Sequence, residues 1–257
     1  METLACIKRV PDTGAKIPLT DDEQRIDTTA LGFTVSPHEE CAVEEAVQQV
    51  EEHGGSATAL TLGTEESTEQ LYTALARAAD DAVLLDTGED DEWRPTETAR
   101  AIADAIGRLA EDGDGFDLLL FGNESADTED YQVGVRVAHE LDLPVVTGIK
   151  EVEIEGDTVV AAREVTGGQE IYELPMPAVL TVKEGVNSPR YASMRSRMRA
   201  NKQEIQRLDP ERDPGAGTFE KIRLESPEGD EGEAEVLGEG PEAVPAIVER
   251  LDDLGVL

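Results

Sequence analysis

The stretch with the most unusual chemistry is residues 187–202, NSPRYASMRSRMRANK, which carries five cations, two methionines and no acidic residue. The whole chain has a formal net charge of −36, with 58 Asp and Glu against 22 Lys and Arg. Methionines flanked by cations suit docking onto acidic protein partners. A nucleic-acid patch and a plain surface loop are the alternatives. The nucleic-acid patch is disfavoured because the remaining surface repels phosphate and Tyr191 is the only aromatic platform nearby.

A second candidate is the loop 122–134, GNESADTEDYQVG, which follows the apolar run 118–121. In an open α/β sheet, ligands bind beyond the carboxyl ends of the strands. Gly122 allows close approach to the backbone, and amides near 130–132 could hold a phosphate at a helix start. No dinucleotide fingerprint or P-loop occurs, so an acid-capped helix start remains the alternative. Three more segments are expected at this edge: 8–13 (KRVPDT), 36–39 (SPHE) and 62–64 (LGT).

Side chains for acid–base or nucleophilic catalysis are not grouped along the sequence. The three histidines are His38, His53 and His139, and the two cysteines, Cys6 and Cys41, lie in apolar settings without metal-like spacing. No HExxH motif and no nucleophile elbow occur. The pattern therefore predicts buried free thiols and no metal site, and it leaves any chemistry to a cofactor.

The acidic residues are spread along the whole chain. Disorder is one interpretation of high charge with 4% aromatic residues, but regular apolar periodicity favours a folded protein with an acid-coated surface. Only 6 of the 22 cations are Lys, and this composition indicates the cytoplasm of an extreme halophile, where salt screens repulsion. The start METLACIKRV lacks a signal pattern, and no apolar run approaches the roughly 20 residues of a membrane helix, so a cytoplasmic location is expected.

Short apolar runs alternate with segments of helical period as far as about residue 150. This alternation predicts an α/β fold, a three-layer α/β/α domain with a mainly parallel sheet. The expected strands are 4–7, 57–62, 82–85 and 118–121, and the expected helices are 39–50, 68–78, 96–109 and 130–141.

After Pro144 the pattern changes to a hairpin over 152–162, with a Gly-Asp turn, and to further strands at 171–174 and 178–182. From about residue 209 the chain is rich in Pro, Gly and Glu, which indicates an extended arm closed by a short helix within 241–254. We therefore expect an α/β domain at 1–208, with a recognition loop at about 187–202, and an arm at 209–257 with few contacts to that domain.

Several motifs occur in a fixed order along residues 1–208. The most specific region is 162–205, with R-E-x-x-G-G-x-E at 163–170, N-x-P-R-Y at 187–191 and a basic run around Met198. The opening IKRVPDT, the helix AVEEA at 42–46 and the D-x-x-x-x-Q-V-G loop at 127–134 precede them. This colinear set resembles the electron-transfer flavoprotein β subunit.

The resemblance implies a heterodimer in which an α subunit holds most of the redox FAD. The β subunit then binds a nucleotide of its own, which is AMP in the housekeeping type and a second FAD in electron-bifurcating relatives; the loops do not separate the two. Here His38 replaces a common Phe, and 127–131 is unusually acidic, which weakens phosphate binding unless cations or salt compensate. By position, the nucleotide-binding residues would be Cys6, Ser36, Pro37, His38, Glu39, Leu62, Gly122, Asn123, Ser125, Ala126, Asp127, Asp130, Tyr131, Gln132 and Val133.

The resemblance also implies an electron carrier rather than an enzyme by itself. It would pass electrons from dehydrogenases, such as acyl-CoA dehydrogenases, to a membrane quinone reductase, without binding nucleic acid or entering the membrane. Glu164 would face the flavin domain of the partner, with an acid on a polar strand edge as the alternative. A nucleotide-binding regulatory module without redox work is the rival function. The partner-binding residues would be the apolar anchor Met194 and the cations Arg190, Arg195, Arg197 and Arg199.

Overall fold

The computed structural model describes residues 1–12, 17–89, 92–111, 113, 115–212, 221–226 and 236–256. The chain divides into two compact units, Met1–Pro18 with Ile26–Ile222 and Leu19–Arg25 with Arg223–Leu257. The first unit contains the expected α/β domain except for Leu19–Arg25, and it extends past the boundary expected at 208, to Ile222. Residues 213–220, 227–235 and 257 of the expected arm lie outside the described residues.

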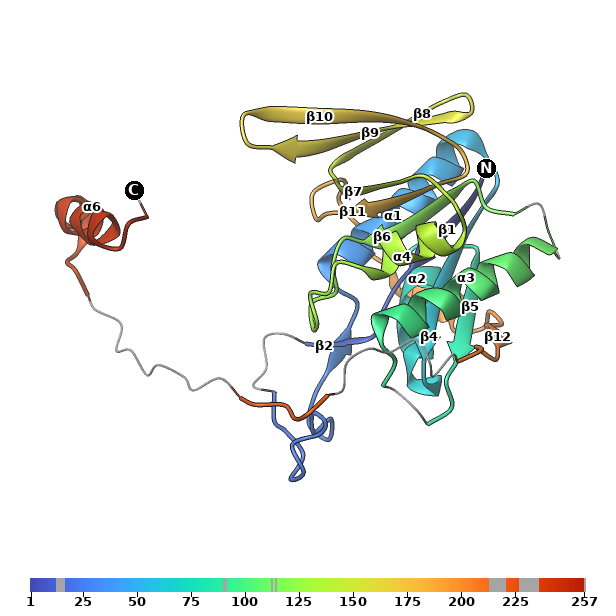
Figure 1. The fold of residues 1–257 in the computed structure, drawn as a ribbon, viewed down its shortest axis with the longest axis horizontal. Coiled ribbons are helices and arrows are strands. Elements are labelled where there is room, and N and C mark those ends of the chain that lie inside the picture. Colours follow the sequence, from blue (N-terminus) through green and yellow to red (C-terminus); the bar gives the residue numbers. More distant parts are fainter. Residues whose placement is uncertain are drawn as a thin grey trace. The chain divides into compact units, whose positions relative to one another are not determined.

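A seven-stranded sheet forms the centre of the first unit, in the order β12-β5-β4-β1-β6-β11-β7 (Figure 1). All neighbouring strands in it are parallel, which confirms the predicted sheet. The two edge strands β7 and β12 are additions to the predicted elements. The strands are β1 (Glu2–Cys6), β4 (Ser56–Gly63), β5 (Asp81–Asp86), β6 (Leu118–Gly122), β7 (Val145–Ile149), β11 (Ala178–Val182) and β12 (Gln206–Leu208).

Helices cover both faces of this sheet, as the three-layer prediction requires. One layer contains α1 (Pro37–His53), α2 (Thr68–Ala76) and α5 (Met194–Ala200), and the other contains α3 (Pro95–Glu111) and α4 (Val133–Glu140).

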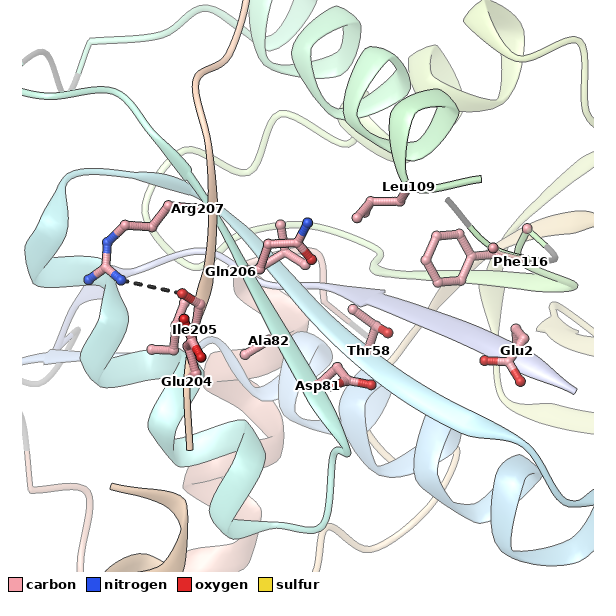
Figure 2. A pocket seen from close by; sticks show the side chains of 13 residues that line it. Glu2, Thr58, Asp81, Ala82, Leu109, Phe116, Glu204, Ile205, Gln206 and Arg207 are labelled. Atoms are coloured by element: carbon pink, nitrogen blue, oxygen red, sulfur yellow. Dashed lines mark hydrogen bonds between the residues drawn. The ribbon is translucent and has the colours of Figure 1, made fainter. Parts of the chain in front are cut away.

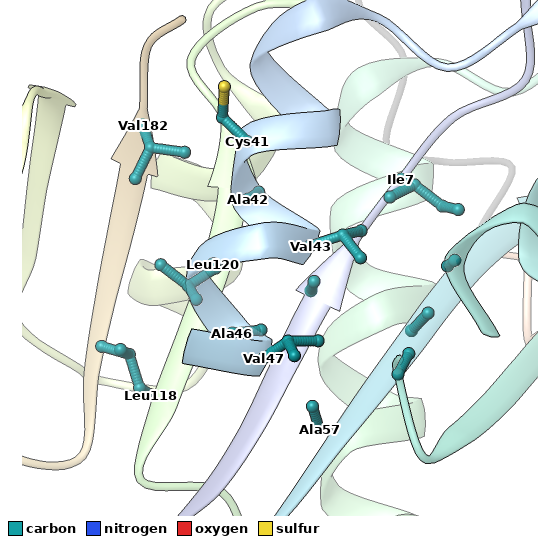
Figure 3. Close-up of a cluster of buried hydrophobic side chains, with 14 of the residues drawn as sticks. Ile7, Cys41, Ala42, Val43, Ala46, Val47, Ala57, Leu118, Leu120 and Val182 are labelled. Atoms are coloured by element: carbon teal, nitrogen blue, oxygen red, sulfur yellow. The ribbon is translucent and has the colours of Figure 1, made fainter. Parts of the chain in front are cut away.

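Successive side chains of the central strand β6 pack alternately against the two helix layers. Leu118 and Leu120 pack with α1 residues such as Val43 (Figure 3). Leu119 packs with α3 residues such as Ile102. Each fully buried leucine contributes about 1.5–3 kcal/mol. A strand buried on both faces must be apolar throughout, which explains the uninterrupted LLLF run.

A separate three-stranded antiparallel sheet follows β7 along the chain and contains β8 (Glu151–Glu155), β9 (Thr158–Val165) and β10 (Gly168–Pro175). The predicted hairpin is confirmed, with Gly156 at positive φ (63°) in its turn. Val159, Ala161 and Leu174 anchor this sheet in the same core as α1. Its other face carries the exposed Ile171 together with the exposed glutamates Glu151, Glu153, Glu155 and Glu173.

Three smaller features complete the described structure. A two-residue pair joins β2 (Val10–Pro11) to β3 (Phe33–Thr34), and a 3₁₀ turn η1 (Glu65–Ser67) precedes α2. The second unit contains η3 (Gly240–Ala243) and the short helix α6 (Val244–Asp253), which has no buried residue. Among the described residues, no helix combines the length and apolar character needed to cross a bilayer.

The helix expected from residue 130 begins three residues later, at Val133. Tyr131 has a φ of 55°, and Glu129 a φ of 50°, in the left-handed region that a right-handed helix excludes. The acidic residues before α4 therefore form a turned loop and not the first helical turn, which leaves the helix start without an acid.

Candidate functional site

A cavity of about 160 Å³ opens at the carboxyl edge of β1 and β6, where the starts of α1, α3 and α4 meet. This is the edge at which ligands bind in open α/β sheets. The cavity collects residues from segments that are far apart in the sequence. The predicted nucleotide-binding residues that line it are Cys6, Glu39, Leu62, Gly122, Asn123, Ser125, Asp130, Tyr131, Gln132 and Val133.

The floor of the cavity depends on a close approach between β6 and the first turn of α1. A Cβ atom on Gly122 would lie 2.7 Å from Cγ of Glu39 and 3.1 Å from its backbone nitrogen, so only glycine fits there. The Glu39 carboxylate accepts a hydrogen bond of 3.1 Å from the Lys8 amide. Burial raises the pKa of Glu39 to about 7, against the opposing effect of that hydrogen bond.

Two pairs of polar side chains lie close to the cavity. Lys8 Nζ lies 2.7 Å from a carboxylate oxygen of Asp127, and His38 Nδ1 lies 3.8 Å from Glu124 Oε1. Burial lowers the pKa of His38, although the Glu124 carboxylate opposes this shift. The predicted residues that do not line the cavity are Ser36, Pro37, His38, Ala126 and Asp127, which lie in the same two segments.

The start of α4 is suited to an anion. Gln132 is its N-cap residue, but the Gln132 side chain accepts a hydrogen bond of 2.8 Å from Arg136 Nε and does not cap the helix. The first-turn amides of an α-helix have no partner within the helix and carry its positive dipole end. A Cβ atom on Gly134 would lie 3.0 Å from Phe121 Cγ and Thr181 Cγ2, so the turn sits tightly against β6 and β11. The start of α4 therefore has the polarity that favours an anion over a cation.

One wall of the cavity was not predicted. Trp93, Pro95, Thr98 and Ile102 line it from the loop and helix that follow β5. The signal was available, because the carboxyl end of β5 leads into this loop and the loop contains the only tryptophan of the chain.

The cavity combines apolar walls with the start of α4 at one edge of the sheet. Leu62, Ile102 and Phe121 supply apolar walls. Burial raises the pKa of the Cys6 thiol far above its ordinary value, so this group is neutral. The volume of about 160 Å³ is below the ~300 Å³ of a typical small-molecule pocket, so the cavity encloses only part of a ligand of that class.

A larger groove of about 880 Å³ lies at the opposite edge of the sheet, where β1, β4 and β5 begin (Figure 2). No predicted site residue lines it. Its lining includes the carboxylates of Glu2, Asp81 and Glu204, which repel an anionic ligand. We therefore place the candidate nucleotide site in the smaller cavity at the carboxyl edge.

The basic stretch contains a short helix, α5, where a loop was expected. Ser193 caps it by accepting a hydrogen bond of 3.1 Å from the Ser196 amide. Tyr191, Met194 and Met198 are exposed to 93%, 77% and 63%. We call the surface formed by these three side chains with Arg195, Arg197 and Arg199 the α5 surface.

Arg190, which was predicted to bind a partner, faces α1. Its guanidinium bonds to both oxygens of the buried Glu44 at 3.0 Å and lies 2.7 Å from Glu51 Oε1. Burial acts to raise the pKa of Glu44, but hydrogen bonds from Arg190 outweigh burial and lower it. Asn187 adds bonds to Glu45 Oε2 (2.8 Å) and the Cys41 carbonyl (3.0 Å). These contacts hold the chain before α5 against α1. We call Arg190 and its ion pairs with Glu44 and Glu51 the Arg190 latch.

Glu164 is exposed on β9, opposite Gln169 of β10. Its neighbour Arg163 donates to Glu170 Oε2 at 3.1 Å and lies over the ring of Tyr172, 5.2 Å from its centroid. Glu164 is therefore on an ordered polar strand surface.

Comparison with known proteins agrees with this architecture. Residues 25–213 match the family model described as the electron transfer flavoprotein domain. The electron transfer flavoprotein subunit beta of Bacillus subtilis is 36% identical over 209 residues, which are 81% of this chain and 79% of that protein. The subunit beta of Thermoanaerobacterium thermosaccharolyticum is 32% identical over 266 residues, with both chains covered completely. That of Mycobacterium bovis is 37% identical over 207 residues, covering 77% of this chain and 75% of its own.

The fold and the family match define a flavoprotein of electron transfer by class. Within that class, the chain belongs to the electron transfer flavoprotein β-subunit family.

Proposed function

We propose that this chain pairs with an α subunit and carries electrons from dehydrogenases, such as acyl-CoA dehydrogenases, to a membrane quinone reductase. The observation that carries the proposal is the family match over residues 25–213, which includes the α5 surface and every cavity-lining residue except Cys6, Ile7 and Lys8. An FAD held mainly by the α subunit supplies the redox chemistry. The chain's own residues bind that subunit, hold a second nucleotide and present a docking surface.

Co-purification tests this pairing. The chain is co-expressed with the α subunit encoded beside it, and the flavin content of the complex is measured by absorbance. We expect a yellow complex with about one FAD per heterodimer. A stable heterodimer without flavin would contradict the carrier function.

The second nucleotide is AMP, bound at the carboxyl-edge cavity. Support comes from the apolar walls at Leu62 and Phe121 and from the acid-free start of α4. Among the described residues that line the cavity, Lys8 is the only Lys or Arg, and its ammonium group would leave Asp127 to bind a phosphate.

Mass spectrometry of the ligand released from the purified chain identifies this nucleotide. AMP is the expected result. FAD would assign the pocket to the electron-bifurcating type, and the absence of any nucleotide would contradict the proposed site.

The α5 surface recognises electron donors, with Met194 as its anchor. Its exposed methionines adapt to pockets of different shape, and Arg195, Arg197 and Arg199 attract acidic proteins. The Arg190 latch holds the surface in place and does not contact the donor. Glu164, on the antiparallel sheet, faces the flavin domain of the α subunit.

Glu164→Ala is expected to change the rate of electron transfer while the FAD content stays the same. Gln169→Ala, directly across the sheet, is the matched control. Equal rates for wild type and Glu164→Ala would show that Glu164 is a surface acid on the strand edge without a role in electron transfer.

The charge of −36 supports a cytoplasm with high salt as the working environment. A melting temperature that rises as KCl increases from about 0.1 M to about 2 M is the expected result, because salt shortens the Debye length from about 10 Å to below 3 Å. A melting temperature that is independent of KCl would contradict this environment.

A further inference from the structure

We propose that Trp93 is a ligand-contacting residue of the carboxyl-edge cavity and that Arg212 is its positioning residue. The nucleotide affinity then depends on the chain segment that leaves the sheet after β12. This inference rests on the proposed nucleotide-binding function and adds to it two residues, neither of which was among the predicted site residues.

The first observation is an unpaired donor in the wall of the cavity. Trp93 lines the cavity, and its indole Nε1 is buried without a hydrogen-bond partner among the described residues. The indole N–H can only donate, and burying a donor without a partner is costly. A nucleotide supplies the missing acceptor, either a ring nitrogen of the base or an oxygen of the ribose or phosphate.

The second observation is that one guanidinium holds the backbone and side chains around Trp93. The Arg212 guanidinium carbon lies 5.0 Å from the centroid of the Trp93 ring, within the range of a cation–π contact. Its Nη2 donates to the Glu92 carbonyl at 2.8 Å, and its Nε donates to Glu97 Oε1 at 3.3 Å. Arg212 therefore contacts the residue before Trp93, the indole itself and the first turn of α3.

Glu97 makes this arrangement rigid. Its side chain is 3% exposed, and it also accepts a hydrogen bond of 3.0 Å from the Arg94 amide. Burial acts to raise the pKa of Glu97, but the bonds from Arg94 and Arg212 outweigh burial and lower it. A buried carboxylate that is kept ionised needs its cation, so Arg212 is fixed in place.

The contacts continue along the segment that contains Arg212. The Asp209 carbonyl accepts a bond of 3.0 Å from Arg108 Nη1, near the end of α3, and Lys221 forms an ion pair with Glu92. Residues 209–212 and Lys221 are thus bound to both ends of α3 and its preceding loop. A change in this segment changes the support of Trp93, and by linkage nucleotide binding stabilises the segment.

Calorimetric titration of the full-length chain with AMP tests the inference, since AMP is also the adenylate half of FAD. The variants are Trp93→Phe, which keeps an aromatic ring without the N–H, and Arg212→Lys, which keeps a charge beside Glu97 without the planar guanidinium. Arg207→Lys is the matched control, because Arg207 also binds a glutamate (Glu65, 2.7 Å) but does not line the cavity.

We expect the AMP dissociation constant to rise about five- to ten-fold in Trp93→Phe and Arg212→Lys, and to change less than about two-fold in Arg207→Lys. Fluorescence supplies a readout that a general loss of stability does not give, because Trp93 is the only tryptophan. AMP should change the emission of wild type, and Arg212→Lys should shift the ligand-free emission to longer wavelength.

The outcomes separate the two proposals. If wild type binds AMP and both variants bind it equally well, the inference is wrong and the proposed nucleotide site stands. If Arg207→Lys weakens binding as much as Arg212→Lys, Arg212 has no specific role. If wild type binds no AMP, the proposed nucleotide site and the inference both fail.

Discussion

The carboxyl-edge cavity and the α5 surface are built on the same helix in opposite ways. The first turn of α1 places Glu39 in the cavity, and its later turns place Glu44, Glu45 and Glu51 against the chain that leads into α5. In the cavity, Glu39 both lines the site and is buried in the fold. At the α5 surface, the exposed side chain (Met194, 77%) and the side chain that holds the segment (Arg190) are different residues.

This difference predicts how stability and function respond to mutation in the two regions. A substitution in the cavity should change stability and ligand binding together, because the same desolvated groups contribute to both. At the α5 surface the two effects should separate, with stability changed by the latch and electron transfer changed by the exposed residues.

The largest expected effect is the pH dependence caused by Glu39. Burial raises its pKa from 4.5 to about 7, so its ionised form destabilises the fold. Stability should be fully present below pH about 4.5 and be lost as pH rises through about 7, by about 3 kcal/mol. Denaturant unfolding of wild type and Glu39→Gln at several pH values measures this, and Glu39→Gln should lack the loss. Parallel pH profiles would show that Glu39 titrates normally.

The next effect concerns the latch. Arg190→Met leaves the buried Glu44 carboxylate without its cation and should lower the free energy of unfolding by about 2 kcal/mol, less than for a fully buried pair because Arg190 is 30% exposed. Denaturant midpoints at constant m-value measure the loss. Arg195→Met is the matched control, since Arg195 is exposed and no ion pair is found for it in the described part of the chain. Equal losses in the two variants would show that the latch adds nothing.

Met194→Ala should affect transfer and not stability. A buried apolar anchor contributes on the order of 1.5–3 kcal/mol, so kcat/KM for transfer from every dehydrogenase donor should fall by on the order of ten-fold or more. The flavin spectrum and the melting temperature should stay nearly unchanged. Wild-type transfer from all donors would contradict the assignment of Met194 as the anchor.

The smallest effect is electrostatic. Replacing Arg195, Arg197 or Arg199 by Gln should slow association with a donor a few-fold at low salt, because rim charges act mainly on the encounter rate. The difference should shrink as KCl is raised. Stopped-flow rates at increasing KCl measure it, and a difference that is independent of salt would indicate a direct contact instead of steering.

The core could be predicted because its periodicity is strong. Leu118, Leu119 and Leu120 form an uninterrupted apolar run, and such a run fits only a strand buried on both faces. The edge strand β12 could not be predicted, because it is only three residues long and its sequence QRL has no apolar period. It pairs with β5 on one side only. Helix α5 also lacks an apolar period, because Ala200 is its only buried residue. The helix was therefore missed.

The candidate site was predicted where residues follow the strands directly. Gly122 and Glu39 meet because two elements converge at one edge of the sheet, and the resemblance also placed them there. Trp93 was missed although its loop follows β5. The sequence does not show that its ring packs against Arg212, more than a hundred residues later.

The most direct test of the central claim is reduction of the co-purified heterodimer by an electron donor. A dehydrogenase with its substrate is mixed with the complex, and the flavin absorbance of the complex is followed over time. We expect this absorbance to be lost in wild type, and to be lost about ten-fold more slowly, to the same final extent, in Met194→Ala. A complex whose flavin is not reduced by any dehydrogenase, or whose rate is unchanged by Met194→Ala, would contradict that claim.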